Sequence, residues 1–263
     1  MYDYHIHTNF SDDSSTPMEE MIDFALKIGV AEIAVTDHFD PDYPDPDFPF
    51  VLDFEKYNKK LAEAAESYNG RIKVVKGIEI GIQSGGTLAK CESAANGYPY
   101  DFVLGSFHAA LDQALDTQYF KNRDAAEGLY DFYTYMASCL AEYSNYDVVG
   151  HFNVVDRYVD PVPDYSPYME VIESILKSLV EDGKGLEFNT SSRSYGMGAR
   201  TMPSSDILKL YKSLGGEIIT IGSDAHKAAD VGRDYHQAVE TLKSSGFRYV
   251  STFENRKPGF VKI

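Results

Sequence analysis

The segment GEIITIGSDAH (residues 216–226) is a short apolar run, rich in β-branched residues, that ends in a cluster of polar side chains. A run of this kind is typical of a buried strand in a parallel sheet. Six further segments have the same form: YDYHIH (2–7), EIAVTDH (32–38), IKVVKGIE (72–79), YDFVLGSFH (100–108), YDVVGH (146–151) and GKGLEFN (183–189). The sequence therefore predicts seven strands, each with chemically useful residues at its carboxyl end.

Segments with the pattern of helices alternate with these strands. Several begin with a Ser, Thr or Asp cap or a proline in the first turn, and most end in Gly or Asn. They are residues 16–29, 52–70, 123–145, 165–183, 202–216 and 231–246. Alternating strands and helices predict either a parallel α/β barrel or an open doubly wound sheet.

The position of the polar clusters favours the barrel. An open sheet gathers its ligand-binding residues at one point where the strand order reverses. A parallel barrel instead places them at the carboxyl ends of many strands, as here. No low-complexity linker divides the sequence, so we expect a single barrel domain over residues 1–263.

Composition excludes several classes of protein. The formal net charge of −17 argues against a general nucleic-acid-binding surface. No basic-then-apolar leader and no run of about 18 apolar residues occurs, which predicts a cytoplasmic protein without membrane partners. Cys91 and Cys139 form no CxxC motif, and we expect both to be reduced, packed thiols.

The histidines concentrate where a barrel would have its active site. Any single histidine is usually a surface residue or one satisfied in the core. Here only His236 lies in a helical segment, whereas the other six fall at the predicted strand ends. These six are His5, His7, His38, His108, His151 and His226. So consistent a placement indicates a metal site.

The spacing within these clusters suits metal coordination. Alternate residues of a strand point to the same side, about 6.6 Å apart at ~3.3 Å per residue, so His5 and His7 can converge on one ion. Asp224 and His226 repeat this spacing. Glu79 supplies a carboxylate able to bridge two ions. For Asp37 we favour an orienting role behind the ligands over direct coordination.

Asp12 and Asp13 follow the first histidine pair. Thr16, before Pro17, looks like the cap of the next helix, which leaves the two aspartates free, and we expect one of them to coordinate. The whole donor set exceeds one tetrahedral site and fits two or three divalent ions. Histidine and carboxylate ligands without thiolates suit Zn, Mn or Fe, among which affinity order alone does not choose.

These motifs together resemble the PHP (polymerase and histidinol phosphatase) superfamily. DYHIHTNFS, VTDH, GIE, GSFH, GH and SDAH stand in the order of that family and cover essentially the whole chain. The resemblance implies a distorted (β/α)7 barrel, related to the TIM barrel. LEFNTS and GHFNVVDRY are similar to the histidinol-phosphatase branch.

The resemblance also implies three groups of metal ligands. The first would be His5, His7, Glu79 and Asp224; the second Glu79, as a bridge, with His108 and His151; and the third His38, His226 and Asp13. Many relatives have a histidine in place of Asp13, so a carboxylate there adds negative charge to the third group.

The chemistry implied is hydrolysis of a small phosphate monoester, with L-histidinol phosphate of histidine biosynthesis as the leading substrate. A hydroxide formed at the metal ions would attack phosphorus in line, because the ions lower the pKa of water toward ~7. Glu79, Asp224 and His226 would be the catalytic members of the set. The alternatives are a phosphoesterase acting on another small ester or a nucleotide, a metal-dependent amidohydrolase and a non-catalytic metal-binding domain.

Arginines after the strand ends are candidates for binding the phosphate, since a guanidinium can hold phosphate through two parallel hydrogen bonds. We rank Arg193 first and Arg157 second, because each directly follows a strand-end motif, and Arg200 is a further candidate. Tyr195, in the glycine-containing segment TSSRSYGMG, is a candidate wall of the substrate pocket. The sequence leaves the oligomeric state open.

Overall fold

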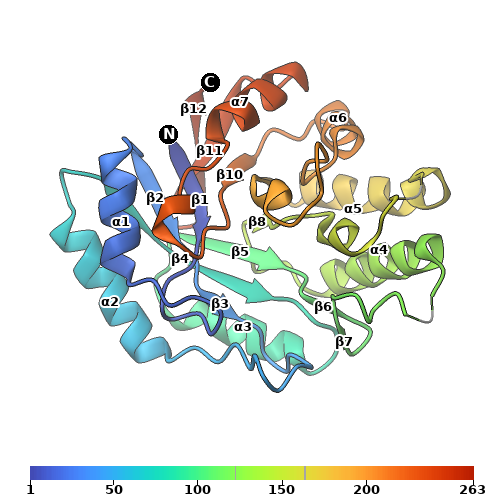
Figure 1. Cartoon of the computed structure of the whole chain (residues 1–263), viewed down its shortest axis with the longest axis horizontal. Helices are drawn as coiled ribbons and strands as arrows, with labels where there is room; N and C mark the ends of the chain where they lie inside the picture. The colour runs from blue at the N-terminus through green and yellow to red at the C-terminus, as the bar shows by residue number, and fades with distance from the viewer. Residues whose placement is uncertain (122, 163) are drawn as a thin grey trace.

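All seven predicted strands are present in the computed structural model, which describes residues 1–121, 123–162 and 164–263. They are parallel and lie side by side in the order β1-β2-β4-β5-β8-β9-β10 (Figure 1). Their bounds are β1 (Tyr2–Ile6), β2 (Glu32–Val35), β4 (Lys73–Gly81), β5 (Phe102–Ser106), β8 (Val148–Val149), β9 (Gly185–Asn189) and β10 (Ile219–Gly222). The predicted α/β architecture is confirmed.

The sheet closes on itself through the segment after β10. The backbone N–H of Asp224 donates to the carbonyl of His5 at 2.8 Å, and that of His7 donates to the carbonyl of Ala225 at 2.9 Å. A single parallel bridge joins Ile6 to Ala225. The result is a nearly closed, distorted barrel of seven strands, as the sequence predicts.

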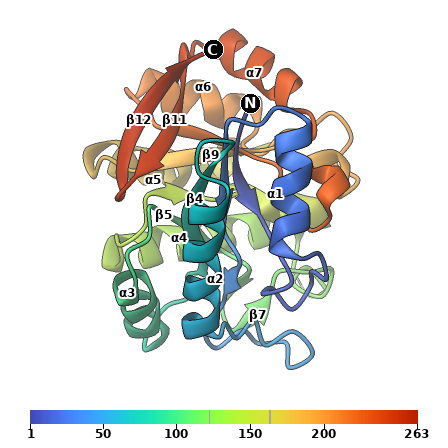
Figure 2. The same cartoon turned by 90° about the vertical axis from the view of Figure 1, so that its left-hand side faces the viewer.

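Helices cover the outside of the barrel, where they bury apolar faces against the strands (Figure 2). They are α1 (Met18–Lys27), α2 (Phe54–Ser67), α3 (Thr87–Gly97), α4 (Ala125–Glu142), α5 (Met169–Glu181), α6 (Ser205–Ser213) and α7 (Tyr235–Ser244). Of these helices the sequence analysis missed only α3, whose buried residues are small (Thr87, Cys91, Ala94 and Ala95) and therefore give a weak helical pattern.

One predicted helix cap is wrong. Pro17, not Thr16, precedes the first turn of α1, and no side chain caps that turn. The hydroxyl of Thr16 instead donates to the carbonyl oxygen of His226 at 3.0 Å. Thr16 therefore ties the loop after β1 to the loop after β10.

Three short paired elements also escaped the sequence analysis. One is β3 (His38–Phe39), which pairs with β4, and another is the small hairpin of β6 (Ala109–Ala110) and β7 (Gln113–Ala114). The third is a hairpin of β11 (Tyr249–Glu254) and β12 (Lys257–Lys262). In Figure 1 the last hairpin lies with both chain termini at one end of the molecule, opposite β3, β6 and β7.

The β11–β12 hairpin closes the amino-terminal end of the barrel. Phe253 is 2% exposed and packs with Tyr4 and Phe102, whose ring centroids lie 6.3 and 4.9 Å from its own. The N–H of Phe253 also donates to the hydroxyl of Tyr4 at 2.8 Å. Arg256, in the turn, pairs with Asp147 at 2.5 Å.

Two further expectations concern the helices and the thiols. Across the described residues, no helix combines the length and apolar character needed to cross a bilayer. Cys91 and Cys139 are buried, free thiols, as predicted.

Replacing Phe253 with Ala should destabilise the protein by about 3–5 kcal/mol, because it leaves a cavity among packed aromatic rings. Chemical denaturation measures this change. Phe260→Ala is the matched control, since Phe260 lies in the same hairpin but is 52% exposed. Equal, small losses in both variants would show that the hairpin does not pack as described.

Candidate metal centre

The carboxyl ends of the strands deliver the predicted histidines and carboxylates to one place. Ligand atoms lie within 4.8 Å of one another in each of four groups: His5, His7 and Asp224; Glu79, His108 and His151; His7, His38 and His226; and His38, Asp40 and His108. The last group includes a carboxylate, Asp40, that the sequence analysis did not name. Asp13 joins the third group, with Oδ2 3.0 Å from Nε2 of His226 and 3.7 Å from Nε2 of His38. The structure thus brings all nine predicted ligands together.

Glu79 lies at the centre of this assembly and is fully buried. Its Oε1 lies 3.2 Å from Nε2 of His151 and 3.4 Å from Nε2 of His108. Its Oε2 lies 2.9 Å from Nδ1 of His38 and 3.3 Å from Nε2 of His5. Each oxygen therefore faces a different group of imidazoles, which is the geometry that a bridging carboxylate needs.

Four imidazole rings point their Nε2 atoms toward Glu79, those of His5, His7, His108 and His151, whereas His38 faces it with Nδ1. The Nε2 atoms of His5 and His7 are 2.9 Å apart, and those of His108 and His151 are 3.2 Å apart. The outer nitrogens of the first pair already have partners, because Nδ1 of His5 lies 2.6 Å from Glu187 and that of His7 lies 3.2 Å from Ser11. Lone pairs converging from several rings fit divalent cations, so the donor set suits a metal centre.

Electrostatics keep the central carboxylates ionised. Burial opposes their charge, but the surrounding imidazoles outweigh it and hold the pKa values of Glu79 and Asp224 well below the usual range. Burial also opposes charge on His5, yet Glu187, Glu79 and Asp224 raise its pKa well above the ordinary value. Burial and the neighbouring imidazoles lower the pKa of His7 to about 3. A fixed negative charge is thus concentrated where cations would bind.

Of the two consecutive aspartates, only Asp13 reaches the cluster. Its carboxylate contacts His226 and His38, and they help to lower its pKa although burial opposes this shift. Asp12 is exposed. Asp37, expected to act from behind the ligands, accepts hydrogen bonds from Thr8 and Ser11 at 2.6–2.8 Å.

Two buried carboxylates of this region were missed by the sequence analysis. Glu187 contacts His5, and Asp40 lies 2.6 Å from Nδ1 of His108. Each follows or lies within a predicted strand segment, GKGLEFN for Glu187 and EIAVTDH for Asp40. Acidic residues at such strand ends are the signal that could have identified them.

Arg157 is the arginine that reaches the metal-ligand cluster. Its Nη2 lies 3.0 Å from the hydroxyl of Ser191 and 3.2 Å from Oδ2 of Asp224. The guanidinium lies 3.6 Å from the ring centroid of Tyr195. Its Nε is buried and has no hydrogen-bond partner in the described parts of the chain. Arg157 therefore has one buried, unpaired donor and lies in the wall of the cavity above the cluster.

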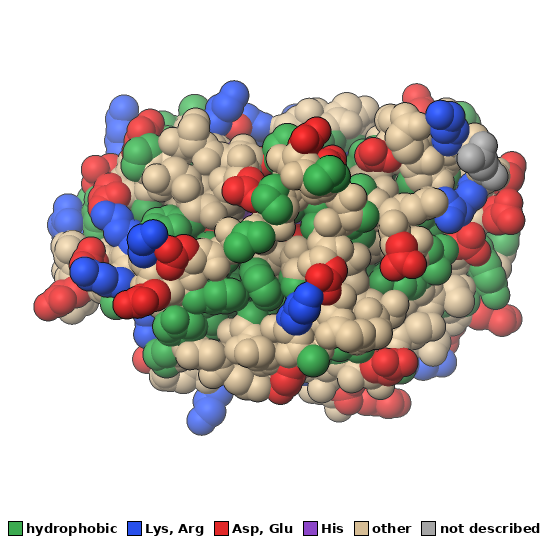
Figure 3. Space-filling view, turned by 90° about the horizontal axis from the view of Figure 1, so that it is seen from below, with side chains coloured by type: hydrophobic (Ala, Val, Ile, Leu, Met, Phe, Trp, Pro, Cys, Tyr) green, Lys and Arg blue, Asp and Glu red, His purple; other side chains and the backbone are tan. Residues whose placement is uncertain are grey.

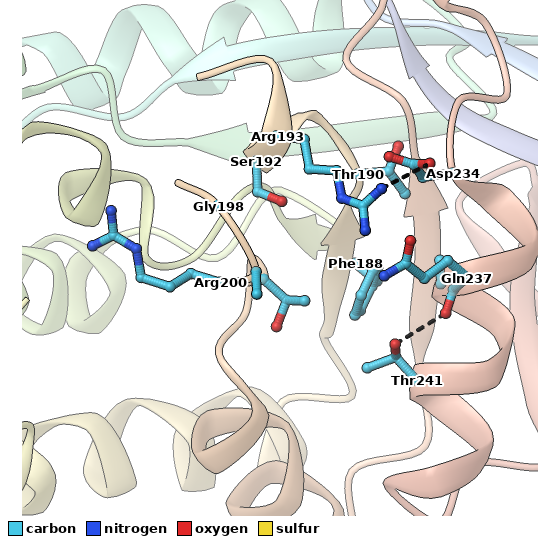
Figure 4. A pocket seen from close by; sticks show the side chains of 12 residues that line it. Phe188, Thr190, Ser192, Arg193, Gly198, Arg200, Asp234, Gln237 and Thr241 are labelled. Carbon is cyan, nitrogen blue, oxygen red and sulfur yellow. Dashed lines mark hydrogen bonds and ion pairs between the residues drawn. The ribbon is translucent and has the colours of Figure 1, made fainter. Parts of the chain in front are cut away.

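The first rank given to Arg193 is not supported by its position. Its guanidinium lies 3.9 Å from Asp234, and its side chain is 56% exposed. Figure 4 shows it pointing toward Asp234 and Gln237, in a pocket on the α7 side of the loop after β9. The Arg193 side chain thus lies at the surface beside the carboxylate of Asp234.

Arg200 also lies away from the metal-ligand cluster, and in Figure 4 its guanidinium points away from Arg193. It donates to the carbonyls of Met197 and Val159 at 3.1 Å and so braces two loops. Its position does not support the expected contact with substrate.

A cavity opens above the cluster. Besides Arg157 and the metal-ligand candidates, aromatic and aliphatic side chains form its wall: Tyr43, Phe50, Phe107, Leu115, Val154, Tyr158 and Tyr195. Tyr195 thus lies where the sequence analysis expects it. Figure 3 views the end of the molecule that carries β3, β6 and β7; hydrophobic side chains gather there and no histidine reaches the visible surface.

Two curated relatives align with nearly the whole chain, and one solved structure has a similar fold. A histidinol-phosphatase of Lactococcus lactis is 29% identical over 97% of this chain and 95% of the relative. A probable histidinol-phosphatase of Clostridium acetobutylicum is 32% identical over 97% of this chain and 98% of the relative. The crystal structure of the Lactococcus lactis histidinol phosphate phosphatase, complexed with zinc, L-histidinol and phosphate, matches with a TM-score of 0.88, 27% identity and 98% coverage of both chains.

The model of one domain family, the PHP domain, matches residues 3–191. That segment extends from the second residue of β1 past the end of β9 and contains seven of the nine predicted metal ligands, all but Asp224 and His226. With a match of this extent and relatives that align over nearly their whole length, the chain belongs to the PHP domain family.

Proposed function

We propose that this chain is a histidinol phosphatase, a phosphoric monoester hydrolase that converts L-histidinol phosphate and water to L-histidinol and phosphate. The observation that carries the proposal is the convergence of three imidazole groups on the two oxygens of Glu79, beside the free donor of Arg157. Relatives with that name align over nearly the whole chain. We also propose that residues 1–263 form one domain, in the cytoplasm.

The metal ions in this proposal are two or three divalent cations. Nitrogen and carboxylate ligands without thiolates suit Zn, Mn or Fe. Glu79 would bridge the ions held by His5, His7 and Asp224 and by His108 and His151. His38, His226 and Asp13 would hold a third. Ions bound there supply positive charge for the phosphoryl oxygens and lower the pKa of water.

The residues around the cluster favour a small anionic substrate. Arg157 is 9% exposed, is held by Asp224 and Ser191, and has its Nε free, so it would donate to a phosphoryl oxygen without first having to be ordered. A cationic donor at this position would stabilise the negative charge on the phosphoryl oxygens in the transition state. His226, paired with Asp13, lies at the more exposed edge of the cluster, where the alcohol would leave.

The walls of the cavity suit a compact leaving group. Phe50 packs against His38 with ring centroids 4.7 Å apart, and Tyr43 packs edge-on against Phe50 at 5.1 Å. Tyr158 lines the same cavity. Flat aromatic walls accommodate a ring such as imidazole. Together with the net charge of −17, they disfavour a nucleic acid backbone as substrate.

A panel of phosphate esters tests the proposal. Purified protein should release phosphate from histidinol phosphate with a higher kcat/KM than from nucleotides, sugar phosphates or p-nitrophenyl phosphate. A better ester would replace histidinol phosphate as the substrate. Release from none of them, with metal bound, would contradict phosphatase activity and favour the amidohydrolase or non-catalytic alternative.

Replacing Glu79 with Gln should lower kcat by at least about 10²–10³-fold, because the neutral amide cannot bridge two cations. The replacement keeps the size of the side chain, so the circular dichroism spectrum should not change. His236→Ala is the control, since His236 is exposed on α7 and should be nearly silent. Full activity in Glu79→Gln would refute the bridging role.

Arg157→Ala should lower kcat/KM by about 10²-fold or more, because a charged donor facing the phosphoryl group is lost. Arg157→Lys should recover only part of the loss, since lysine lacks the guanidinium fork. Arg200→Ala, which removes two contacts to backbone carbonyls, should lower the Tm with little change in kcat/KM. An equal fall in kcat/KM for Arg157→Ala and Arg200→Ala would argue against the assignment.

Removal of metal by a chelator should abolish phosphate release and lower the Tm. Ligands that bind only the folded state stabilise it, by about 2.7 kcal/mol at 100 times Kd. Elemental analysis before treatment should find two or three ions per chain, and adding Zn²⁺, Mn²⁺ or Fe²⁺ back should restore activity. Activity that persists in metal-free protein would contradict the proposal.

A further inference from the structure

Two buried carboxylates contact the imidazoles from outside the cluster and have no part in the proposed reaction. The first is Glu187, in the middle of β9, which is fully buried. Its Oε1 lies 2.6 Å from Nδ1 of His5. Its Oε2 accepts from the backbone N–H of His151 at 2.7 Å and from the side-chain amide of Asn189 at 3.1 Å. Glu187 thus touches residues of two different ligand groups.

The second is Asp40, which directly follows β3 and contacts His108 as Glu187 contacts His5. It is 2% exposed, and its Oδ1 lies 2.6 Å from Nδ1 of His108. Its Oδ2 lies 3.4 Å from Nδ1 of His38. The opposite nitrogen of His108 faces Glu79, so Asp40 contacts the side of that ring which points away from the centre. Asp40 also joins two different ligand groups.

A glycine makes room for each carboxylate. A Cβ built at Gly222 would overlap Oε1 of Glu187, and one built at Gly81 would overlap Oδ1 and Cγ of Asp40. Gly81 ends β4, and Gly222 ends β10. Any residue larger than glycine at these two positions would displace the neighbouring carboxylate, so Gly222 and Gly81 are needed for the observed placement of Glu187 and Asp40.

We propose that Glu187 and Asp40 are positioning residues that fix the tautomer and ring orientation of His5 and His108 for metal binding. This inference rests on the proposed metal centre. A carboxylate that accepts a hydrogen bond from Nδ1–H leaves Nε2 with its lone pair and aims it at the cation. It also makes the imidazole a more basic ligand. Each carboxylate couples two ligand groups, so its loss weakens more than one ion's site.

The test measures metal affinity rather than turnover. Metal-free protein is titrated with Zn²⁺ against a competing chelator of known affinity. Glu187→Gln and Asp40→Asn should each weaken binding by about 10–100-fold, with the same number of ions bound at saturation. Both replacements keep shape and remove only charge and acceptor strength.

A second variant disturbs the contact between Asp40 and His108 by steric overlap and replaces no ionisable residue. Gly81→Ala keeps Asp40 and His108 in the protein but pushes their carboxylate and ring apart. It should weaken Zn²⁺ binding in the same direction as Asp40→Asn. This variant keeps the inference testable if Asp40→Asn fails to fold.

Asp147→Asn is the matched control. Asp147 is also a buried carboxylate, accepting from Val103 N–H at 2.8 Å and pairing with Arg256, but it lies at the other end of the barrel. This variant should lower the Tm of the metal-free protein and leave Zn²⁺ affinity unchanged.

Three results would overturn the inference. Wild-type Zn²⁺ affinity in Glu187→Gln and Asp40→Asn would show that the carboxylates do not position the ligands. Loss of one whole ion at saturation in Asp40→Asn would make Asp40 a ligand itself. In both cases the proposed metal centre stands, whereas a wild-type protein that binds no Zn²⁺ would overturn the centre and the inference together.

Discussion

The burial of Glu79 is the constraint on which the rest of the site depends. Its carboxylate has no exposed surface, is held in its ionised form, and meets five imidazoles within 3.6 Å: His5, His7, His38, His108 and His151. A buried charge is costly unless it is paired. Among these rings, His5 and His108 use Nδ1 for the outer carboxylates Glu187 and Asp40 and face Glu79 with Nε2. Divalent cations bound between these nitrogens and Glu79 would balance its negative charge.

The fold explains how residues so distant in sequence reach one carboxylate. Parallel strands end at the same rim of the barrel, so a residue placed after each strand faces the same space. Closure between β1 and β10 brings Asp224 beside His5 through a direct backbone hydrogen bond. The amino-terminal end is filled by Phe253 and its neighbours, which keeps the stabilising core apart from the polar rim. A small apolar cluster thus fills one end of the barrel and the metal-ligand candidates lie at the other, while the main core packs between the strands and the helices.

The sequence predicts well those features that depend on a short local pattern of residues. The seven strands are confirmed because each is a short apolar run, and their polar ends come together because the parallel strands of a barrel all end at one rim. The direction of a long side chain is not predictable in this way. Arg193 and Arg157 both follow strand ends, yet Arg193 lies beside Asp234 at the surface, whereas Arg157 pairs with Asp224 in the cluster. Glu187 and Asp40 were missed because their role depends on which ring nitrogen they face. The helix α3, rich in alanine, was missed for lack of amphipathic contrast.

Anomalous X-ray diffraction from crystals grown with Zn²⁺ tests the central claim most directly. The account predicts at least two peaks about 3.5–4 Å apart, one near each oxygen of Glu79, with imidazole nitrogens ~2.0–2.1 Å from the ions. An empty space between the imidazoles, with the rings hydrogen-bonded only to one another and to water, would contradict it.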